Sequence, residues 1–186
     1  MMIEDIQNQV FCDKKINSTK EIDFKNCQFK NIDFSDSEFQ KVGFVDCHFE
    51  NCDFSNTVLN ECSIIRTKLN NCKMIGTDFS GSYFLEISFE SCNLMYTNYS
   101  NTNIKKTLFQ NNNVEKSSFN EVKLDKIKLH NNNLIESEWI GTNLKNVDLS
   151  DCKIDGILVD KNLLNGLIVN ENQAISFSKL LGIVIK

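Results

Sequence analysis

The sequence predicts an all-β fold in which the chain winds as a solenoid around an apolar interior. Every fifth residue from Phe24 to Val169 is apolar, and the phase never slips. The residue two positions earlier is small or β-branched in most repeats, as at Cys27 and Thr57. Asn, Asp, Ser, Lys and Gly fill much of the remaining positions, and most of these residue types favour turns. These three observations predict a chain that turns once per repeat.

The five-residue period fits neither a straight helix nor a flat strand. In an α-helix, a step of five residues rotates by about 140°, which would spread the apolar side chains over every face. In a strand, an odd step alternates between the two sides of the sheet. The chain must therefore bend once per repeat, so that the small and the large residue face inward and the residue between them faces outward. Successive turns then pair through backbone hydrogen bonds.

Residues 1–19 fall out of this phase, and we expect them to cap the open N-terminal end of the solenoid. Val10, Phe11 and Ile16 are the apolar residues expected to cover that end. The segment has no basic start and no apolar run, so it does not resemble a signal peptide. No stretch of the chain is long and apolar enough to cross a bilayer. We therefore expect a cytoplasmic protein without a membrane segment.

Residues 20–169 form the expected β-helix domain, and residues 170–186 form the expected capping or dimerisation segment. Asn170 can N-cap a helix, and Gln173 completes a capping-box-like start. Apolar residues at helical spacing follow, and Gly182 can end the helix. Such an apolar end can pair with a second copy or fold back over its own last coil. The residues expected at a dimer contact are Phe177, Leu180, Leu181, Ile183 and Ile185.

Repeats such as CDFSN, TDFSG and TNLKN resemble the pentapeptide-repeat family across roughly residues 20–170. The resemblance implies a right-handed quadrilateral β-helix, whereas the sequence itself favours four sides only weakly, through cysteine separations of 20 residues. The tail NENQAISFSKLLGIVIK and the segment SEWIGTNLKNVDLSDC resemble the quinolone-resistance (Qnr) type of this family. That resemblance implies a homodimer formed through the C-terminus, and binding to DNA gyrase or topoisomerase IV by mimicry of DNA.

In a four-sided coil, residues twenty apart would stack along the interior. Cys52, Cys72 and Cys92 would then form one column, which Asn112 and Asn132 continue. We expect the thiols to be small groups that fill narrow space, and the alternative is that neighbouring thiols form disulfides. The asparagines are expected to form a hydrogen-bonded ladder, because unpaired buried amides are costly, and the alternative is a buried ligand.

The sequence contains no catalytic constellation. His48 and His130 fall on outward positions, far apart, and no spacing indicates an activated nucleophile or a metal site. The phosphate-loop and zinc-protease motifs are missing as well. We therefore expect a non-enzymatic protein that has no cofactor and no metal.

The net charge of −5 is concentrated in the first half of the chain. Between Asp33 and Glu61 there are seven acidic residues and one base, Lys41. A basic cluster between Lys105 and Lys128 is interleaved with acids, so we expect a solvated mixed-charge face and no direct nucleic-acid binding. The acidic residues expected to bind a partner are Asp33, Asp36, Glu38, Asp46, Glu50 and Asp53.

Val45, Ile65 and Leu85 form a second candidate surface. They occupy outward positions twenty residues apart, so a four-sided coil would align them in one column, and aligned exposed apolar residues indicate an interface. The first hypothesis is a DNA mimic that binds gyrase or topoisomerase IV and modulates sensitivity to quinolones or toxins. The modest net charge and the unbroken repeat, which lacks the loops of the Gram-negative resistance proteins, depart from that pattern. The alternative is a structural or regulatory scaffold for an unrelated protein.

Overall fold

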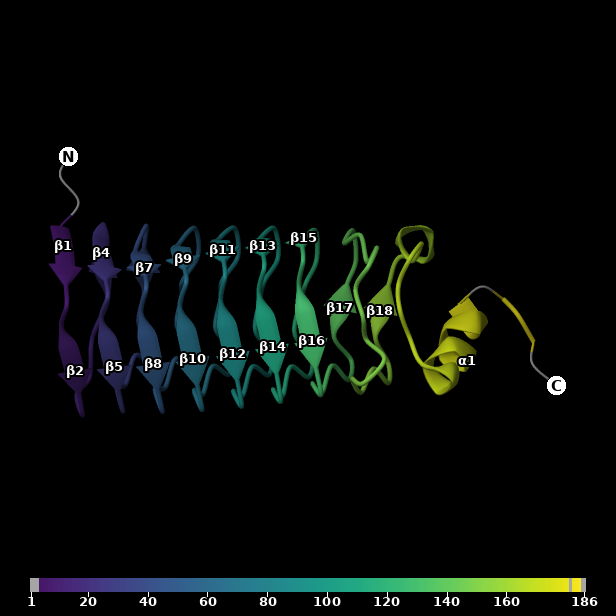
Figure 1. Cartoon of the computed structure of the whole chain (residues 1–186), viewed down its shortest axis with the longest axis horizontal. Helices are drawn as coiled ribbons and strands as arrows, with labels where there is room; N and C mark the ends of the chain where they lie inside the picture. Colours follow the sequence, from purple (N-terminus) through teal and green to yellow (C-terminus); the bar gives the residue numbers. More distant parts are fainter. Residues whose placement is uncertain (1–3, 181, 185–186) are drawn as a thin grey trace.

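The computed structural model describes residues 4–180 and 182–184. The chain forms a right-handed, four-sided β-helix that ends in a short helix, which confirms the expected fold class (Figure 1). Phe24 pairs with Phe44, and Phe44 pairs with Ile64, so one coil contains twenty residues and four repeats. Beyond the first coil, each residue therefore lies over the one twenty positions earlier.

Two of the four faces are continuous parallel sheets, which run side by side along the rod (Figure 1). Face A contains β1 (Glu4–Gln7), β4 (Ile22–Lys25), β7 (Gly43–Val45), β9 (Ser63–Ile65), β11 (Tyr83–Leu85), β13 (Asn103–Lys105) and β15 (Lys123–Asp125). Face B contains β2 (Val10–Cys12), β5 (Gln28–Lys30), β8 (His48–Glu50), β10 (Lys68–Asn70), β12 (Ser88–Glu90), β14 (Leu108–Gln110) and β16 (Lys128–His130).

The other two faces pair more sparsely. On face C, single bridges join residues twenty apart, as between Asp53 and Lys73. Face D has similar bridges, such as Val58 with Asp78, between two short sheets. These sheets are β3 (Thr19–Lys20) with β6 (Phe39–Gln40), and β17 (Glu138–Trp139) with β18 (Leu158–Val159). The 3₁₀ helix η1 (Lys161–Leu163) and the helix α1 (Glu171–Leu180) follow.

Corner residues turn the chain from one face to the next. They lie two positions after the large inward residue and take the left-handed conformation, with φ of 53° at Asn31, 55° at Asn56 and 68° at Gly76. Asn tolerates positive φ better than most other non-glycine residues, because its short polar side chain can bond locally. The polar residues predicted at turns are therefore selected largely by backbone conformation.

The large inward residues stack in columns along the rod. The rings of Phe29 and Phe49 are parallel with centroids 4.5 Å apart, and the rings of Phe34 and Phe54 are also 4.5 Å apart. Rings on adjacent faces meet edge to face, as Phe29 and Phe34 do at 61°. Both geometries are favourable for aromatic pairs. The interior is thus a packed aromatic core.

The small inward residues bond to the backbone of neighbouring coils. The Thr77 hydroxyl donates to the Phe54 carbonyl at 2.8 Å. Asn112 Nδ2 donates to Asn132 Oδ1 at 3.1 Å and to the Phe89 carbonyl at 3.0 Å, which confirms the expected ladder. All eight cysteines are free thiols, and all except Cys12 are buried. The column therefore fills space without disulfides.

The N-terminal segment differs from the expected cap. The strand β1 pairs with β4, and β2 pairs with β5, so residues 4–20 form a first coil. Ile6 lies beside Phe24, eighteen residues away, whereas Thr19 lies beside Phe39 at the usual twenty. The sequence loses its phase here because this coil is two residues shorter, with its strands still paired to the next coil.

The three apolar residues expected to cover the N-terminal end behave differently. Phe11 and Ile16 pack against the core, and Phe11 stacks on Phe29 with centroids 4.9 Å apart. Val10 points outward and is 65% exposed, contrary to the expectation. Val10 directly precedes the inward Phe11 in β2, and neighbouring side chains in a strand face opposite sides.

The C-terminal helix begins as the sequence predicts. The Asn170 N–H donates to Gln173 Oε1 at 2.9 Å, and the Gln173 N–H donates to Asn170 Oδ1 at 3.0 Å. Gln173 Nε2 also donates to the carbonyls of Leu149 and Cys152, both at 2.8 Å. Gly182 has a φ of 73° and ends the helix. Gln173 thus joins the helix to the last coil.

Candidate protein-interaction surfaces

Val45, Ile65 and Leu85 form a column on face A. They pair directly in register on β7, β9 and β11, and all three are half-buried. We call these three residues the apolar column. Lys25 precedes it and Lys105 follows it in the same register. The predicted alignment is therefore real, and it is confined to the first half of the rod.

Charged residues form a ladder along the corner beside the apolar column. Arg66 Nε and Nη2 donate to the two Asp46 carboxylate oxygens at 2.6 and 2.7 Å. Lys106 pairs with Glu86 at 2.9 Å. The hydrogen bond from Arg66 lowers the pKa of Asp46, and the same bond raises the pKa of Arg66. The apolar column is therefore bordered by charges that already neutralise one another.

Most of the acidic residues expected at a partner contact are neutralised within the chain. Four of the six form ion pairs with residues of an adjacent coil. The pairs are Asp33 with Lys15, Asp46 with Arg66, Glu50 with Lys30 and Asp53 with Lys73. They also lie on different faces, since Asp33 and Asp53 are on face C and Glu50 is on face B. The structure does not bring the six together.

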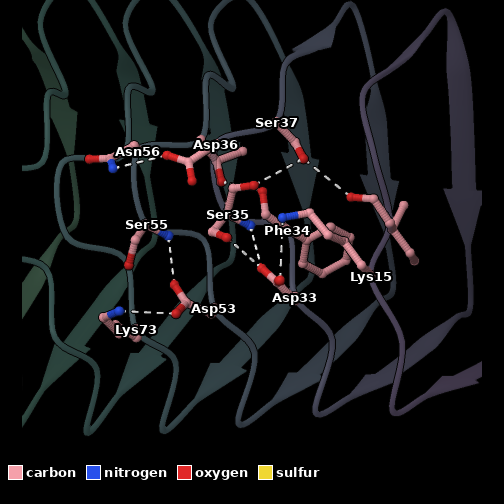
Figure 2. Close-up of polar contacts among 12 residues, drawn as sticks. Lys15, Asp33, Phe34, Ser35, Asp36, Ser37, Asp53, Ser55, Asn56 and Lys73 are labelled. Carbon is pink, nitrogen blue, oxygen red and sulfur yellow. Dashed lines mark hydrogen bonds and ion pairs between the residues drawn. The ribbon is translucent and has the colours of Figure 1, made fainter.

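The carboxylates of face C bind local serines as well as lysines. Figure 2 shows Asp33, which accepts from the Ser35 N–H at 2.9 Å and the Ser35 hydroxyl at 2.6 Å. Asp53 accepts from the Ser55 N–H at 2.8 Å and pairs with Lys73 at 3.0 Å (Figure 2). The bond from the Ser35 hydroxyl is the main cause that lowers the pKa of Asp33. These groups stabilise the corner of the coil.

A different set of acids lies on face D and its corners. Among the described residues, no ion pair involves any member of this set. We call this set the acidic strip, and it consists of Asp36, Glu38, Glu61 and Asp78. Neutral donors satisfy some of these carboxylates, as Asn56 does for Asp36 at 3.1 Å and Asn98 for Asp78 at 2.9 Å.

Sequence reasoning selected Asp36 and Glu38 but missed Glu61 and Asp78 as members of one strip. The coil length could have found them, because it predicts which residue lies twenty positions from each acid. Asp46 lies twenty residues before Arg66, and this spacing predicts the ion pair. Asp78, in contrast, lies twenty residues before Asn98, so its partner in the next coil is a neutral amide.

The histidines and cysteines do not form a reactive site. His48 Nε2 contacts Asn70 Nδ2 at 3.3 Å, and His130 Nδ1 lies 3.4 Å from an Asp151 oxygen on a separate coil. Burial raises the pKa of Cys47 to about 12, which keeps this thiol protonated. Across residues 4–180 and 182–184, no cluster of His, Cys, Asp or Glu could hold a metal ion.

The C-terminal end exposes several apolar residues. Leu180 is 47% exposed and Ile183 is 53% exposed, whereas Phe177 is buried against the chain's own last coil. The two further residues expected at a dimer contact, Leu181 and Ile185, lie outside the described residues. A groove of about 520 Å³ separates α1 from the last coil. No helix in the described part of the chain is long and apolar enough to cross a membrane.

Comparison with protein-family models matches the pentapeptide repeat region at residues 22–87, 62–139 and 82–159. A search of curated proteins gave no match. Full-length QnrB1, a plasmid-mediated fluoroquinolone resistance protein, is a similar solved structure with 17% identity and a TM-score of 0.41, covering 96% of this chain and 100% of that one. HetL, a pentapeptide repeat protein involved in heterocyst differentiation regulation in the cyanobacterium Nostoc, has 9% identity and a TM-score of 0.30, covering 90% and 87%. The A-module of the mannuronan C-5 epimerase AlgE4 of Azotobacter vinelandii has 9% identity and a TM-score of 0.31, covering 84% and 64%.

Proposed function

This chain belongs to the pentapeptide repeat family, and we propose that it is a non-enzymatic rod that binds another protein. The observation that carries this proposal is the apolar column. Three half-buried aliphatic side chains lie in register on adjacent strands, so a partner can cover them with a flat or extended surface. Removing aligned apolar groups of this kind from water lowers the free energy of the complex.

The rigid backbone supports the same proposal. Face A is a seven-stranded parallel sheet, and its outward side chains are held at fixed spacing by the aromatic core beneath. A preorganised surface loses little conformational entropy on binding, so even a small apolar contact contributes fully to affinity. The ion ladder through Asp46 and Arg66 borders the apolar column and can orient a partner.

For the partner, we propose a type II topoisomerase, either DNA gyrase or topoisomerase IV. Enzymes that bind DNA present basic surfaces to phosphates, and the acidic strip on face D offers carboxylates without an ion-pair partner in the described chain. This surface is smaller than the six acids expected from the sequence, since four of those are neutralised. The alternative is a scaffold that binds an unrelated protein through the apolar column alone.

We also propose a homodimer through the C-terminal end. Leu180 and Ile183 are about half exposed, which is unusual for apolar residues of a rod end and is relieved by pairing with a second copy. Phe177 supports this end from within, because it packs on the chain's own core. Sedimentation analysis of wild type and Leu180→Asp tests the proposal, and a wild-type monomer at high concentration would contradict it.

Direct binding measurements test the topoisomerase proposal. Immobilised protein would be exposed to gyrase and to topoisomerase IV holoenzymes, with the variant Asp36→Asn, Glu38→Gln, Glu61→Gln, Asp78→Asn beside the wild type. We expect the wild type to bind and the neutralised variant to bind more weakly, with a smaller salt dependence. Binding to neither enzyme would overturn the topoisomerase proposal and favour the scaffold alternative.

A further inference from the structure

The sheets on faces A and B stop two coils before the repeat does. The strands β15 and β16 are the last members of their sheets, although the next coil continues the five-residue phase through Leu144 and Leu149. Faces C and D pair across the same step, as Leu134 does with Lys153. Two adjacent coils are therefore joined on one side of the rod and separated on the other.

The separation appears in the backbone hydrogen bonds. In earlier coils, the Lys123 N–H donates to the Thr102 carbonyl at 3.0 Å, and the Lys106 N–H donates to the Asp125 carbonyl at 2.7 Å. Within the described chain, the equivalent backbone bonds from Asn143 and Lys126 across the next step are missing. Backbone groups without a protein partner need water or a ligand.

The separation also opens the core to solvent. Leu124 and Ile127 are half-buried, whereas Ile104 and Thr107, at the same positions one coil earlier, are fully buried. A groove of about 860 Å³ lies at this place on face A. We call it the β15 groove, and its lining includes Glu121, Val122, Lys123, Leu124, Asn143 and Lys145.

Several lysines lie at the β15 groove, together with the acidic Glu121. Lys123 and Lys145 line it, and neither belongs to an ion pair of the described chain. Lys126 and Lys128 lie nearby, in the corner and in β16, and are likewise exposed. These lysines lie in the C-terminal half of the rod, whereas the acidic strip lies in its N-terminal half.

We propose that the β15 groove is a docking site for an extended acidic segment of a partner protein. Its carboxylates would meet Lys123 and Lys145, an apolar side chain would contact Leu124, and its backbone can bond to the groups left unpaired beside Asn143. Glu121 in the lining and Asp125 in β15 would repel the continuous phosphates of a nucleic acid, whereas a peptide can place neutral residues there. This inference goes beyond the proposed function, because the groove lies outside both the apolar column and the acidic strip.

The test uses fluorescence anisotropy with a labelled peptide of alternating Glu and Leu residues. Wild-type full-length protein should bind it, and the double variant Lys123→Glu, Lys145→Glu should lose at least about tenfold in affinity. The matched control is Lys41→Glu, Lys68→Glu, which makes the same change in net charge at exposed lysines elsewhere on the rod and should bind as the wild type does. Circular dichroism would verify that each variant is folded.

A second probe separates the peptide from a nucleic acid. A single-stranded oligonucleotide of similar length should bind more weakly than the acidic peptide. Three results would overturn the proposal: no binding of the peptide by the wild type, equal loss in the matched control, or preference for the oligonucleotide.

Discussion

Asn170 and Gln173 cap the last helix reciprocally, each donating its backbone N–H to the side-chain oxygen of the other at 2.9 and 3.0 Å. The same Gln173 side chain donates to two carbonyls of the last coil. The Gln173 side chain thereby follows Cys152 along the interior of the rod, and the helix takes the place of a further coil. The closing of the solenoid and the start of the helix depend on one amide.

We expect Gln173→Ala to lower the free energy of unfolding by about 2 kcal/mol, because the carbonyls of Leu149 and Cys152 and the N–H of Asn170 lose their partner. Urea unfolding measures the change. The neighbouring exposed residue provides the control, and Asn172→Ala should alter stability by less than about 0.5 kcal/mol. Equal effects of the two substitutions would contradict the role assigned to Gln173.

The asparagine ladder makes a second prediction. Asn112 accepts from the Cys92 N–H at 2.8 Å and donates to the Phe89 carbonyl at 3.0 Å. Asn112→Leu keeps a similar volume but removes both bonds, and we expect a loss of roughly 2–4 kcal/mol. Asn112→Thr should cost less, because Thr67 bonds to equivalent groups, the Cys47 N–H and the Phe44 carbonyl, two coils earlier on the neighbouring face. A higher Tm for Asn112→Leu than for Asn112→Thr would contradict this prediction.

The ion pair of Asp46 and Arg66 predicts a pH dependence. The hydrogen bond from Arg66 lowers the pKa of Asp46 in the folded chain. A lowered pKa adds stability above the unfolded value of about 3.9, and this contribution is lost as the pH falls through the folded pKa. Asp46→Asn should therefore be less stable than the wild type at pH 7, by a small amount because the pair is exposed, and the difference should vanish in acid. A deficit that persists near pH 2 would contradict this assignment.

Thiol reactivity reports whether the coils stay closed. Cys12 is exposed, whereas the other cysteines are buried, and burial raises the pKa of both Cys62 and Cys152 to about 11. We expect a disulfide reagent to titrate one thiol in the native protein and eight after denaturation. Rapid native reaction of several thiols would mean that the coils open readily.

Much of the rod could be predicted from the sequence, because each five-residue repeat of the sequence forms one side of a coil. The five-residue phase predicts the inward residues, and the spacing of Asn112 and Asn132 predicts their ladder. The first coil was misjudged because its strands pair eighteen residues away, as Ile6 does with Phe24. The five-residue period does not predict pairing between residues eighteen apart.

The candidate surfaces were harder to predict for two physical reasons. The apolar column follows directly from the coil length, but the charge of an acid depends on what lies twenty residues away, as Arg66 does for Asp46. The β15 groove depends on which backbone groups fail to pair, and the phase through Leu144 continues as if they did.

The apolar column gives the prediction closest to function. Leu85→Asp should leave Tm nearly unchanged, because the side chain is only half-buried, and should lower partner affinity at least about tenfold. Leu108→Asp is the matched control, since Leu108 is also an outward, half-buried residue of a strand but lies on face B.

The most direct measurement is a gyrase supercoiling assay in which the wild type, Leu85→Asp and Leu108→Asp are titrated with and without a quinolone. We expect the wild type and Leu108→Asp to inhibit supercoiling or to relieve the drug's effect, and Leu85→Asp to do neither. Absence of any effect of the wild type, or equal activity of all three proteins, would contradict a topoisomerase partner bound through the apolar column.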